Sequence, residues 1–409
     1  MRLDLKKGWL NRNVLATGIV SLLSDASHEI VTALLPLFVT LSSALGGLGA
    51  DAALLGTIEG LSDGLSSASK PVSGHLSDRS KRRKPWMVFG YVATGVLLPA
   101  IAFVQTYIGL AILRISSWIG RGVRGPPRDA LLSDSVQPEQ YGKAFGFHRA
   151  MDSIGAVIGP VLAFLLLPYL GVRHTILVAF VPGALSVLVV VLFIKETKGV
   201  RKGDDTLSLR DSISSLPRRF KLLLVAQGTF GIGNFANSLF ILAALQIMSP
   251  SLGEIAAASA SLGLYALLNA VYALASFPVG VLADKRGKAG LLGLGYLFNA
   301  LACLILAFWI DSVVVIGFAF VAVGLQLAFT DTTEAALAAE LLPKKVVGTG
   351  YGVLQFVDGV GDFASSFVVG MLWVLFSPVV GLLYSALLSV IAWATILWLM
   401  RKPHPDAGV

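Results

Sequence analysis

Long apolar stretches recur along the chain at a regular spacing. They fall near residues 13–40, 52–76, 85–106, 108–131, 142–168, 174–194, 221–248, 254–283, 289–310, 312–338, 347–376 and 378–400. A helix needs about 20 residues to cross the hydrocarbon core of a bilayer. Only 14% of the 409 residues are charged, whereas soluble proteins carry about 25%. The sequence therefore predicts an all-α integral membrane protein with twelve transmembrane helices, which excludes a soluble enzyme or a disordered chain.

Basic residues are concentrated on one side of the predicted membrane. Of the 32 Lys and Arg residues, 24 lie at the two chain ends, in the loops after even-numbered helices and in the 195–221 segment, whereas the opposite loops contain only Arg173. Loops rich in Lys and Arg stay in the cytoplasm. We therefore expect a multi-pass protein of the inner (cytoplasmic) cell membrane with both termini in the cytoplasm.

The two halves of the chain repeat each other. Gly74 and Asp78 recur as Gly280 and Asp284, each 206 residues later. Similar pairs at nearly the same offset follow over about eighty residues. Parallel repeats of this kind are typical of transporters built from two bundles around an axis along the membrane normal. The pattern predicts two pseudo-symmetric six-helix bundles.

The longest polar segment lies between the halves and sets the predicted domain boundaries. We expect an N-terminal six-helix bundle at 1–194, a cytoplasmic linker at 195–221 and a C-terminal six-helix bundle at 222–409. Within the linker, Leu207–Ile213 is compatible with a short amphipathic helix on the membrane surface or with a solvated tether.

The loop after the second predicted helix carries the strongest motif. Residues 74–84 read GHLSDRSKRRK, which resembles the G-x-L-a-D-r-x-G-r-r signature of the major facilitator superfamily, with Lys81 where a second Gly is usual. The resemblance covers essentially the whole chain and implies a secondary transporter that works by alternating access. An Asp at a helix end can pair with a neighbouring cation, so we expect a cytoplasmic latch here. The predicted gate residues are Gly74, Asp78, Arg79, Arg82, Gly280, Asp284 and Arg128.

A second motif lies in the fifth predicted helix. Gly155, Gly159 and Pro160 resemble the G-x-x-x-G-P core of the signature of antiporters in the same superfamily, which implies export in exchange for protons. G-x-x-x-G is also an ordinary helix-packing face, and that alternative stays open. In either case these three residues are predicted to pack helices together.

Ionisable residues occur near the middle of several predicted helices, where each costs about 2.5–3.5 kcal/mol to insert. The predicted proton-coupling and substrate residues are Asp25, His28, Glu29, Glu59, Asp63, Arg114, His148, Arg149, Asp152, Asp358 and Asp362. Carboxylates outnumber arginines in this set, so several acids lack an obvious fixed cation. Such acids suit the binding and release of protons, although permanently protonated acids could also serve as hydrogen-bonding groups between helices. We expect Arg114 to pair with Asp25 or a neighbouring acid.

The leading functional hypothesis is a proton-coupled exporter of a small molecule. One alternative is uptake of a small organic anion, guided by Arg114, Arg121, Arg124 and Arg128. Another is a divalent-metal carrier, since Asp25, His28, Glu29, His148 and Asp152 offer N and O ligands.

The sequence contains no phosphate-binding loop and no nucleophile elbow. We therefore expect no enzyme activity, no cofactor and no resident metal ion. The expected partners are the substrate, protons and the lipid bilayer, without nucleic acid, and the protein is expected to act as a monomer.

Overall fold

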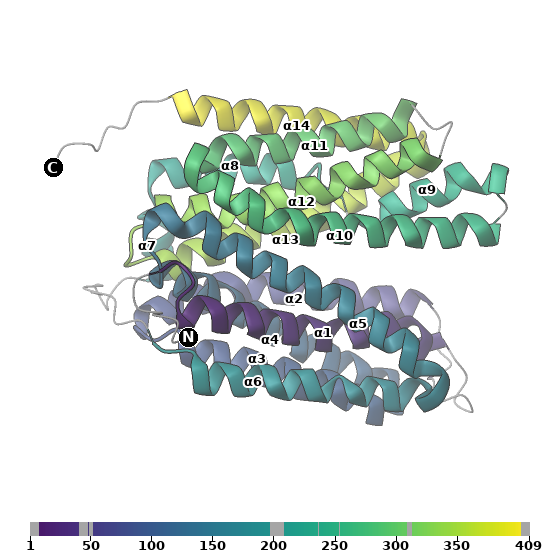
Figure 1. The fold of residues 1–409 in the computed structure, drawn as a ribbon, viewed down its shortest axis with the longest axis horizontal. Coiled ribbons are helices and arrows are strands. Elements are labelled where there is room, and N and C mark those ends of the chain that lie inside the picture. The colour runs from purple at the N-terminus through teal and green to yellow at the C-terminus, as the bar shows by residue number, and fades with distance from the viewer. Residues whose placement is uncertain are drawn as a thin grey trace. The chain divides into compact units, whose positions relative to one another are not determined.

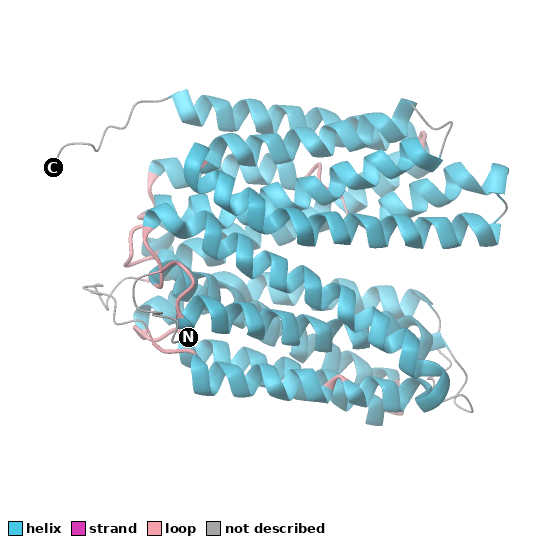
Figure 2. Cartoon of the chain, in the orientation of Figure 1, coloured by secondary structure: helices cyan, strands magenta, loops and turns pink. Residues whose placement is uncertain are grey.

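The structure is a computed structural model of the 409-residue chain, and it describes residues 8–40, 48, 52–196, 208–235, 237–252, 254–308 and 313–401. These ranges form helices joined by short turns, with no strand among them (Figures 1 and 2). The helices are α1 (Arg12–Thr40), α2 (Ala52–Arg79), α3 (Lys84–Ala100), η2 (Ile101–Phe103), α4 (Tyr107–Asp134), η3 (Pro138–Gln140), α5 (Tyr141–Val178), α6 (Phe180–Phe193), α7 (Leu209–Ser214), α8 (Arg218–Gly231), α9 (Asn237–Leu252), α10 (Glu254–Arg286), α11 (Lys288–Phe308), α12 (Val313–Leu341), α13 (Val347–Leu375) and α14 (Pro378–Arg401).

All twelve predicted spans coincide with helices. The fifth and sixth spans run together through α5 and α6, where Gly171 breaks the helical dihedrals with φ 69°. The seventh span is divided between α8 and α9. In the linker, α7 covers most of the predicted amphipathic segment, although Leu207 lies outside the described residues.

Polarity separates the helices into two groups. Within the described ranges, nine helices are long and apolar enough to cross a membrane by themselves. The predicted spans outside that group are α2 and α4, which carry many charged side chains, and the α8–α9 pair, whose members are 14 and 16 residues long. A charged helix is tolerated in a bilayer when its polar face is turned toward protein or a water-filled path.

The break between α8 and α9 has its own polar partners. The Ser365 hydroxyl donates to the Asn234 carbonyl at 2.8 Å, and the Tyr384 hydroxyl donates to the Ile232 carbonyl at 3.0 Å. Carbonyl groups freed by a helix break cannot be solvated by lipid and must find partners inside the protein. These two bonds therefore let the chain interrupt a helix in this part of the protein.

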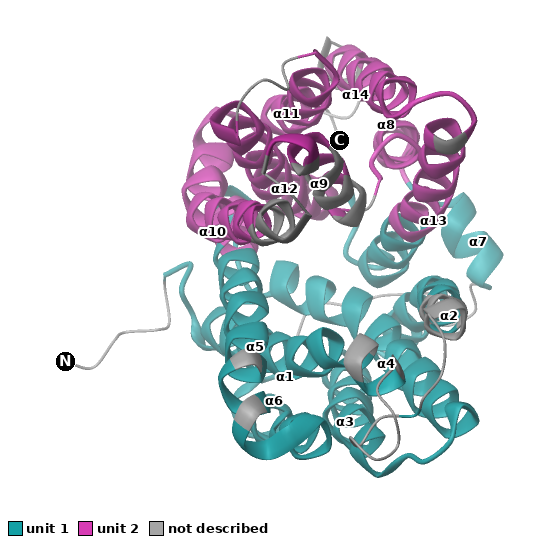
Figure 3. Cartoon of the chain, turned by 90° about the vertical axis from the view of Figure 1, so that its right-hand side faces the viewer, with its two compact units in different colours: residues 1–140, 147–216, 342–356 teal, residues 141–146, 217–341, 357–409 magenta. Residues whose placement is uncertain are grey.

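The chain divides into two compact units, coloured separately in Figure 3. Unit 1 contains residues 1–140, 147–216 and 342–356, and unit 2 contains 141–146, 217–341 and 357–409. Each unit has its own apolar core, which includes Phe38 and Trp118 in unit 1 and Phe240 and Phe320 in unit 2. The start of α5 thus belongs to unit 2, and the start of α13 belongs to unit 1. The domain boundaries at 194 and 222 stay predictions.

Candidate functional site

Two carboxyl groups from different helices of unit 1 meet inside it. Asp25 on α1 is buried, and its carboxyl group faces that of Asp152 on α5, close enough for the two to hydrogen-bond when one of them is protonated. The Ser21 hydroxyl donates to Asp152 Oδ1 at 2.5 Å, and Arg149 Nη1 lies 3.6 Å from Asp152 Oδ2. Ionised carboxylates only accept hydrogen bonds, so a bond between two of them requires a shared proton.

The two helices approach closely because α5 presents small residues to α1. A Cβ atom on Gly155 would collide with the Leu22 carbonyl oxygen, and one on Gly159 would collide with the Ala26 carbonyl oxygen. Gly155 follows Asp152 by three residues and therefore lies on the same face of α5. The glycines predicted to pack helices together thus bring the Asp152 carboxyl group to α1. Pro160 follows them in the same helix.

One turn along α1 from Asp25, a second cluster surrounds His28. Its Nδ1 lies 3.1 Å from Glu29 Oε1, and its Nε2 lies 2.9 Å from Arg121 Nη1. The imidazole also packs against the Trp118 ring, with 4.6 Å between centroids. His28 therefore lies between an acid of its own helix and a cation and an indole of α4.

Trp118 joins this cluster to two further predicted residues. Its indole Nε1 donates to Asp63 Oδ1 on α2 at 2.7 Å. The Arg114 guanidinium, which is fully buried, lies 3.3 Å from the Trp118 ring centroid. A guanidinium over an indole face is a favourable cation–π contact. The side chain of Glu59, the other predicted acid of α2, lies outside the described residues.

The sequence predicts that Arg114 forms an ion pair with Asp25 or with a neighbouring acid. Among the described residues, the structure has no ion pair between Arg114 and Asp25. The cations that act on Asp25 are Arg121 and Arg124, whereas Arg114 and Arg121 act on Glu29. Glu29 is thus one acid close enough to Arg114 to interact with it electrostatically. The spacing of residues in the sequence predicted which residues of α1 and α4 share a helical face, but it did not predict which acid lies near Arg114.

His148 is the least exposed of the predicted histidines. It is buried on α5, with Arg128, Asp152, Asp129 and Arg149 as its charged neighbours. Arg128 Nε donates to Asp129 Oδ1 at 2.9 Å. His148 is thus a neighbour both of Asp152 and of Arg128, which is one of the predicted gate residues.

Asp358 and Asp362 lie on the part of α13 that belongs to unit 2. Asp358 is half-buried and, with Glu334, neighbours the Tyr296 hydroxyl, which donates to Gln227 Oε1 at 2.7 Å. Asp362 is exposed. These acids form a separate group from the Asp25–Asp152 pair of unit 1.

The predicted latch residue Asp78 lies at the end of α2 and caps the start of α13. Its carboxylate accepts hydrogen bonds from the Gly348 amide at 3.1 Å, the Thr349 amide at 2.6 Å and the Thr349 hydroxyl at 2.9 Å. The first amides of a helix have no partner within that helix. Gly74 lies one turn before Asp78, and any Cβ atom there would collide with the Gly348 carbonyl oxygen.

The cation beside Asp78 is a residue that the sequence did not single out. Arg83 Nη1 lies 2.6 Å from Asp78 Oδ1, and Arg83 Nε lies 3.8 Å from Asp134 Oδ2. Arg79 and Arg82, predicted for the gate, are both exposed. Lys81 has φ 55°, and this left-handed turn leads the chain back so that Arg83 reaches Asp78. A left-handed residue favours Gly, which explains the Gly usual at this place in the signature.

The second copy of the motif makes the same kind of contact in unit 2. Asp284 at the end of α10 accepts hydrogen bonds from the Gly142 amide at 2.7 Å and the Lys143 amide at 2.9 Å, at the start of α5. A Cβ atom on Gly280 would collide with the Gly142 carbonyl oxygen. Sequence reasoning located both Asp residues but not the helix starts that they cap.

Comparison with known proteins agrees with this architecture. The profile of the Major Facilitator Superfamily matches residues 17–236 and 223–409. An uncharacterized MFS-type transporter of Methanocaldococcus jannaschii is 29% identical over 392 residues, or 95% of each chain. A multi-drug resistance efflux pump PmrA homolog of Lactococcus lactis is 24% identical over 361 residues, or 86% of this chain and 85% of the relative.

Among solved structures, the E. coli fucose:proton symporter FucP has a TM-score of 0.76 at 14% identity, covering 95% of this chain and 98% of its own. That likeness shows the fold. Together with the profile match over nearly the whole length, it shows that this chain belongs to the Major Facilitator Superfamily of membrane transporters.

Proposed function

We propose that this transporter exports a small molecule in exchange for protons by alternating access. The observation that carries the proposal is the close approach of the buried Asp25 carboxyl group to that of Asp152, which Ser21 and Arg149 hold in place. One proton bound between two buried acids can be lost when water reaches them. The two negatively charged carboxylates that remain then repel each other in a medium of low polarity, which favours binding a proton again. The pair therefore suits a group that takes up a proton on one side and releases it on the other.

The neighbours of the pair support different tasks for its two members. Ser21 and Arg149 both stabilise a charged Asp152. Asp25 has no cation within ion-pair distance among the described residues, and we assign the mobile proton to it. Glu29, His28 and Arg121 form the next group along α1, and a charged substrate that approaches Arg121 would compete with Glu29 and His28.

The direction of transport is inferred from the relatives and from α5. The Lactococcus relative is named as a multi-drug efflux pump, and Gly155, Gly159 and Pro160 match the core of the antiporter signature. Both favour export over uptake. We also propose that Asp78 and Asp284 act as cytoplasmic latches, with both termini in the cytoplasm, on the basis of the predicted excess of basic residues on that side.

A second candidate is uptake of a small organic anion. It is favoured by the two guanidinium groups around Trp118, at 3.3 Å for Arg114 and 5.6 Å for Arg121. Arg binds carboxylate and phosphate groups through a planar fork that Lys lacks. The metal-carrier alternative receives no such support, since no three His, Cys, Asp or Glu side chains in the described ranges lie close enough together to hold an ion.

The test compares uphill transport with equilibrium exchange in proteoliposomes. Each assay uses a panel of labelled cationic, neutral and anionic compounds, with or without an imposed pH gradient. Asp25→Asn is expected to abolish gradient-driven transport while exchange at equal pH continues, because the variant cannot release a proton. Glu29→Gln tests the second acid of α1, and Glu139→Gln, an exposed acid of η3, is the matched control.

Two outcomes would contradict the proposal. If Asp25→Asn, Asp152→Asn and Glu29→Gln all still concentrate substrate against its gradient, the coupling site lies elsewhere, and Asp358 and Asp362 are the next acids to test. If wild-type protein moves only anions inward, the organic-anion candidate replaces export.

A further inference from the structure

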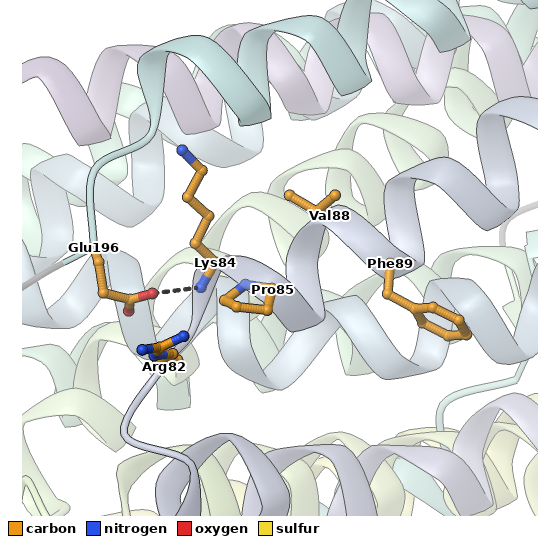
Figure 4. A pocket seen from close by; sticks show the side chains of 6 residues that line it. All are labelled: Arg82, Lys84, Pro85, Val88, Phe89 and Glu196. Atoms are coloured by element: carbon orange, nitrogen blue, oxygen red, sulfur yellow. Dashed lines mark hydrogen bonds between the residues drawn. The ribbon is translucent and has the colours of Figure 1, made fainter.

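Arg82 belongs to the signature loop, but its guanidinium makes no ion pair with Asp78, whose cation partner is Arg83. Arg82 is exposed, and its guanidinium makes no hydrogen bond or ion pair among the described residues, whereas its neighbour Arg83 is fully buried beside Asp78. Arg82 instead lines a pocket of about 580 Å³ at the start of α3, together with Lys84, Pro85, Val88, Phe89 and Glu196 (Figure 4). This cation is therefore available to a ligand.

The polar end of the pocket carries net positive charge. Glu196 is its one acid, and both carboxylate oxygens are occupied, because Oε1 accepts the Arg83 amide at 2.7 Å and Oε2 accepts the Lys84 amide at 3.1 Å. Figure 4 shows the second of these bonds. Lys84 Nζ donates to the Val191 carbonyl at 2.7 Å, which uses one of its three N–H donors. Arg82 and the remaining donors of Lys84 can therefore bind an anionic group.

The other end of the pocket continues into an apolar stripe along α3. Phe89, Val92 and Val96 follow at spacings of three and four residues, so they share one helical face. Their exposed fractions are 59%, 40% and 48%. In a membrane protein such a face contacts acyl chains. The pocket thus joins a cationic end to a lipid-facing apolar surface within about three helical turns.

A neighbouring pocket shows what distinguishes this one. It has about 480 Å³ and is lined by Arg12, Leu15, Ala16, Ile19, Val189 and Phe193. There the single cation is already engaged, since Arg12 Nε donates to the Phe193 carbonyl and Nη2 donates to the Leu192 carbonyl, both at 2.8 Å. Two of the five N–H donors of Arg12 are used by these carbonyl groups, and no second cation lines that pocket.

We infer that the pocket formed by Arg82, Lys84, Val88 and Phe89 binds the headgroup of an anionic phospholipid, with an acyl chain along α3. Basic pockets beside transmembrane helices on the cytoplasmic side are suited to such headgroups, and the cytoplasmic leaflet is the anionic one. The leaflet follows from the orientation under the proposed function, but the binding does not depend on the direction of transport or on its coupling.

The experiment measures lipid binding to the purified full-length protein in detergent by native mass spectrometry. Dioleoyl phosphatidylglycerol is expected to bind more tightly than dioleoyl phosphatidylcholine. Arg82→Gln should weaken phosphatidylglycerol binding about fivefold, which is the contribution expected of one basic residue near an anionic surface, and should leave phosphatidylcholine unchanged. Arg79→Gln, which removes an exposed cation from the same loop but not from the pocket, is the matched control.

Two further variants separate charge from stability. Glu196→Gln removes the negative charge and should strengthen phosphatidylglycerol binding, an effect that a merely destabilising change would not produce. Phe89→Ala should weaken both lipids to a similar extent.

Three outcomes would overturn the inference. Wild-type protein could bind both lipids equally, Arg82→Gln and Arg79→Gln could have the same effect, or soluble glycerol phosphate could bind as tightly as phosphatidylglycerol. The last result would assign the pocket to a soluble phosphate compound. Because no transport is measured, none of these outcomes bears on the proposed export.

Discussion

Asp78 at the end of α2 and Asp284 at the end of α10 occupy equivalent places in the repeat, yet they are held differently. Both accept hydrogen bonds from the second and third amides of a following helix, α13 for Asp78 and α5 for Asp284. Asp78 also accepts the Thr349 hydroxyl and pairs with the fully buried Arg83. Asp284 instead has Lys288 at 3.9 Å.

The cations explain most of this difference. Arg83 lies between Asp78 and Asp134, at 2.6 and 3.8 Å, and both of these acidic partners are buried. Lys288 Nζ lies 2.9 Å from the exposed Glu340, which can keep the lysine paired if Asp284 is lost. The two caps share the same pair of backbone hydrogen bonds, yet removing the acid should cost a different free energy in each. Arg83 loses its near partner with Asp78, whereas Lys288 keeps Glu340 when Asp284 is removed.

The largest effect is expected from Asp78→Asn. The change leaves the buried Arg83 with one distant acid, and breaking a buried ion pair by removing one partner costs about 3–5 kcal/mol. We expect the transport rate in proteoliposomes to fall about tenfold or more, while circular dichroism shows unchanged helix content. Glu139→Gln is the control. A transport rate equal to wild type would remove the latch from the proposal.

A smaller loss is expected from Asp284→Asn. Asn still accepts one amide, and Lys288 keeps Glu340 as its partner, so the cost should be about 1–2 kcal/mol, in the range of a hydrogen bond to a charged group. The transport rate should fall about threefold in the same assay. Equal losses in the two variants would show that the copies are equivalent and that the cations do not set their strength.

Thr349→Val tests the bond that only the first copy possesses. Removing the hydroxyl deletes one of three hydrogen bonds to Asp78 and keeps the volume, with an expected cost of about 1 kcal/mol. The check is the midpoint of thermal unfolding in detergent, with Thr349→Ser as the variant that retains the hydroxyl. If Val leaves the midpoint unchanged while Ser lowers it, the methyl contact matters and the hydrogen bond does not.

The smallest effect, and the only gain, is expected from Lys81→Gly. Lys81 has φ 55°, and Gly287, the equivalent residue of the second copy, has φ 92°. A non-glycine residue in this conformation costs about 1–2 kcal/mol, partly offset by the greater flexibility of Gly in the unfolded chain. The thermal midpoint should rise slightly, whereas Gly287→Lys should lower it. A lower midpoint for Lys81→Gly would mean that the lysine side chain itself holds the turn.

Much of the fold was accessible from the sequence, for a local reason. The apolar runs predicted all twelve spans, and the offset of 206 residues identified Asp284 as the partner copy of Asp78. The length of an apolar run and the offset of a repeat can both be read directly from the order of residues in the chain, so predicting them requires no knowledge of how the helices pack. The same local reading placed Asp25 and Glu29 on one face of α1.

The partners of those residues were less accessible. Arg79 and Arg82 were predicted for the cytoplasmic gate and the cation partner of Asp78 was left open; the structure gives Arg83 as that partner. Ser21 and Trp118 were missed as site residues. Ser21 is uncharged and was not considered, and Trp118 was considered only as one of several aromatic residues that could line an apolar cavity. The four-residue spacing of Ser21 and Asp25 is the one signal that could have included Ser21.

The sequence by itself determined that this chain crosses a membrane as two repeated halves, because apolar length and charge asymmetry act residue by residue. Only the tertiary structure decided that Asp25 meets Asp152, that Asp78 meets Arg83, and that Arg82 is left to face a pocket. Those choices depend on how closely α1 and α5 approach at Gly155 and on one left-handed residue at Lys81. A hydrogen bond is lost when its donor and acceptor move apart by about an ångström, and positions on that scale are set by helix rotation and backbone turns, not by residue spacing.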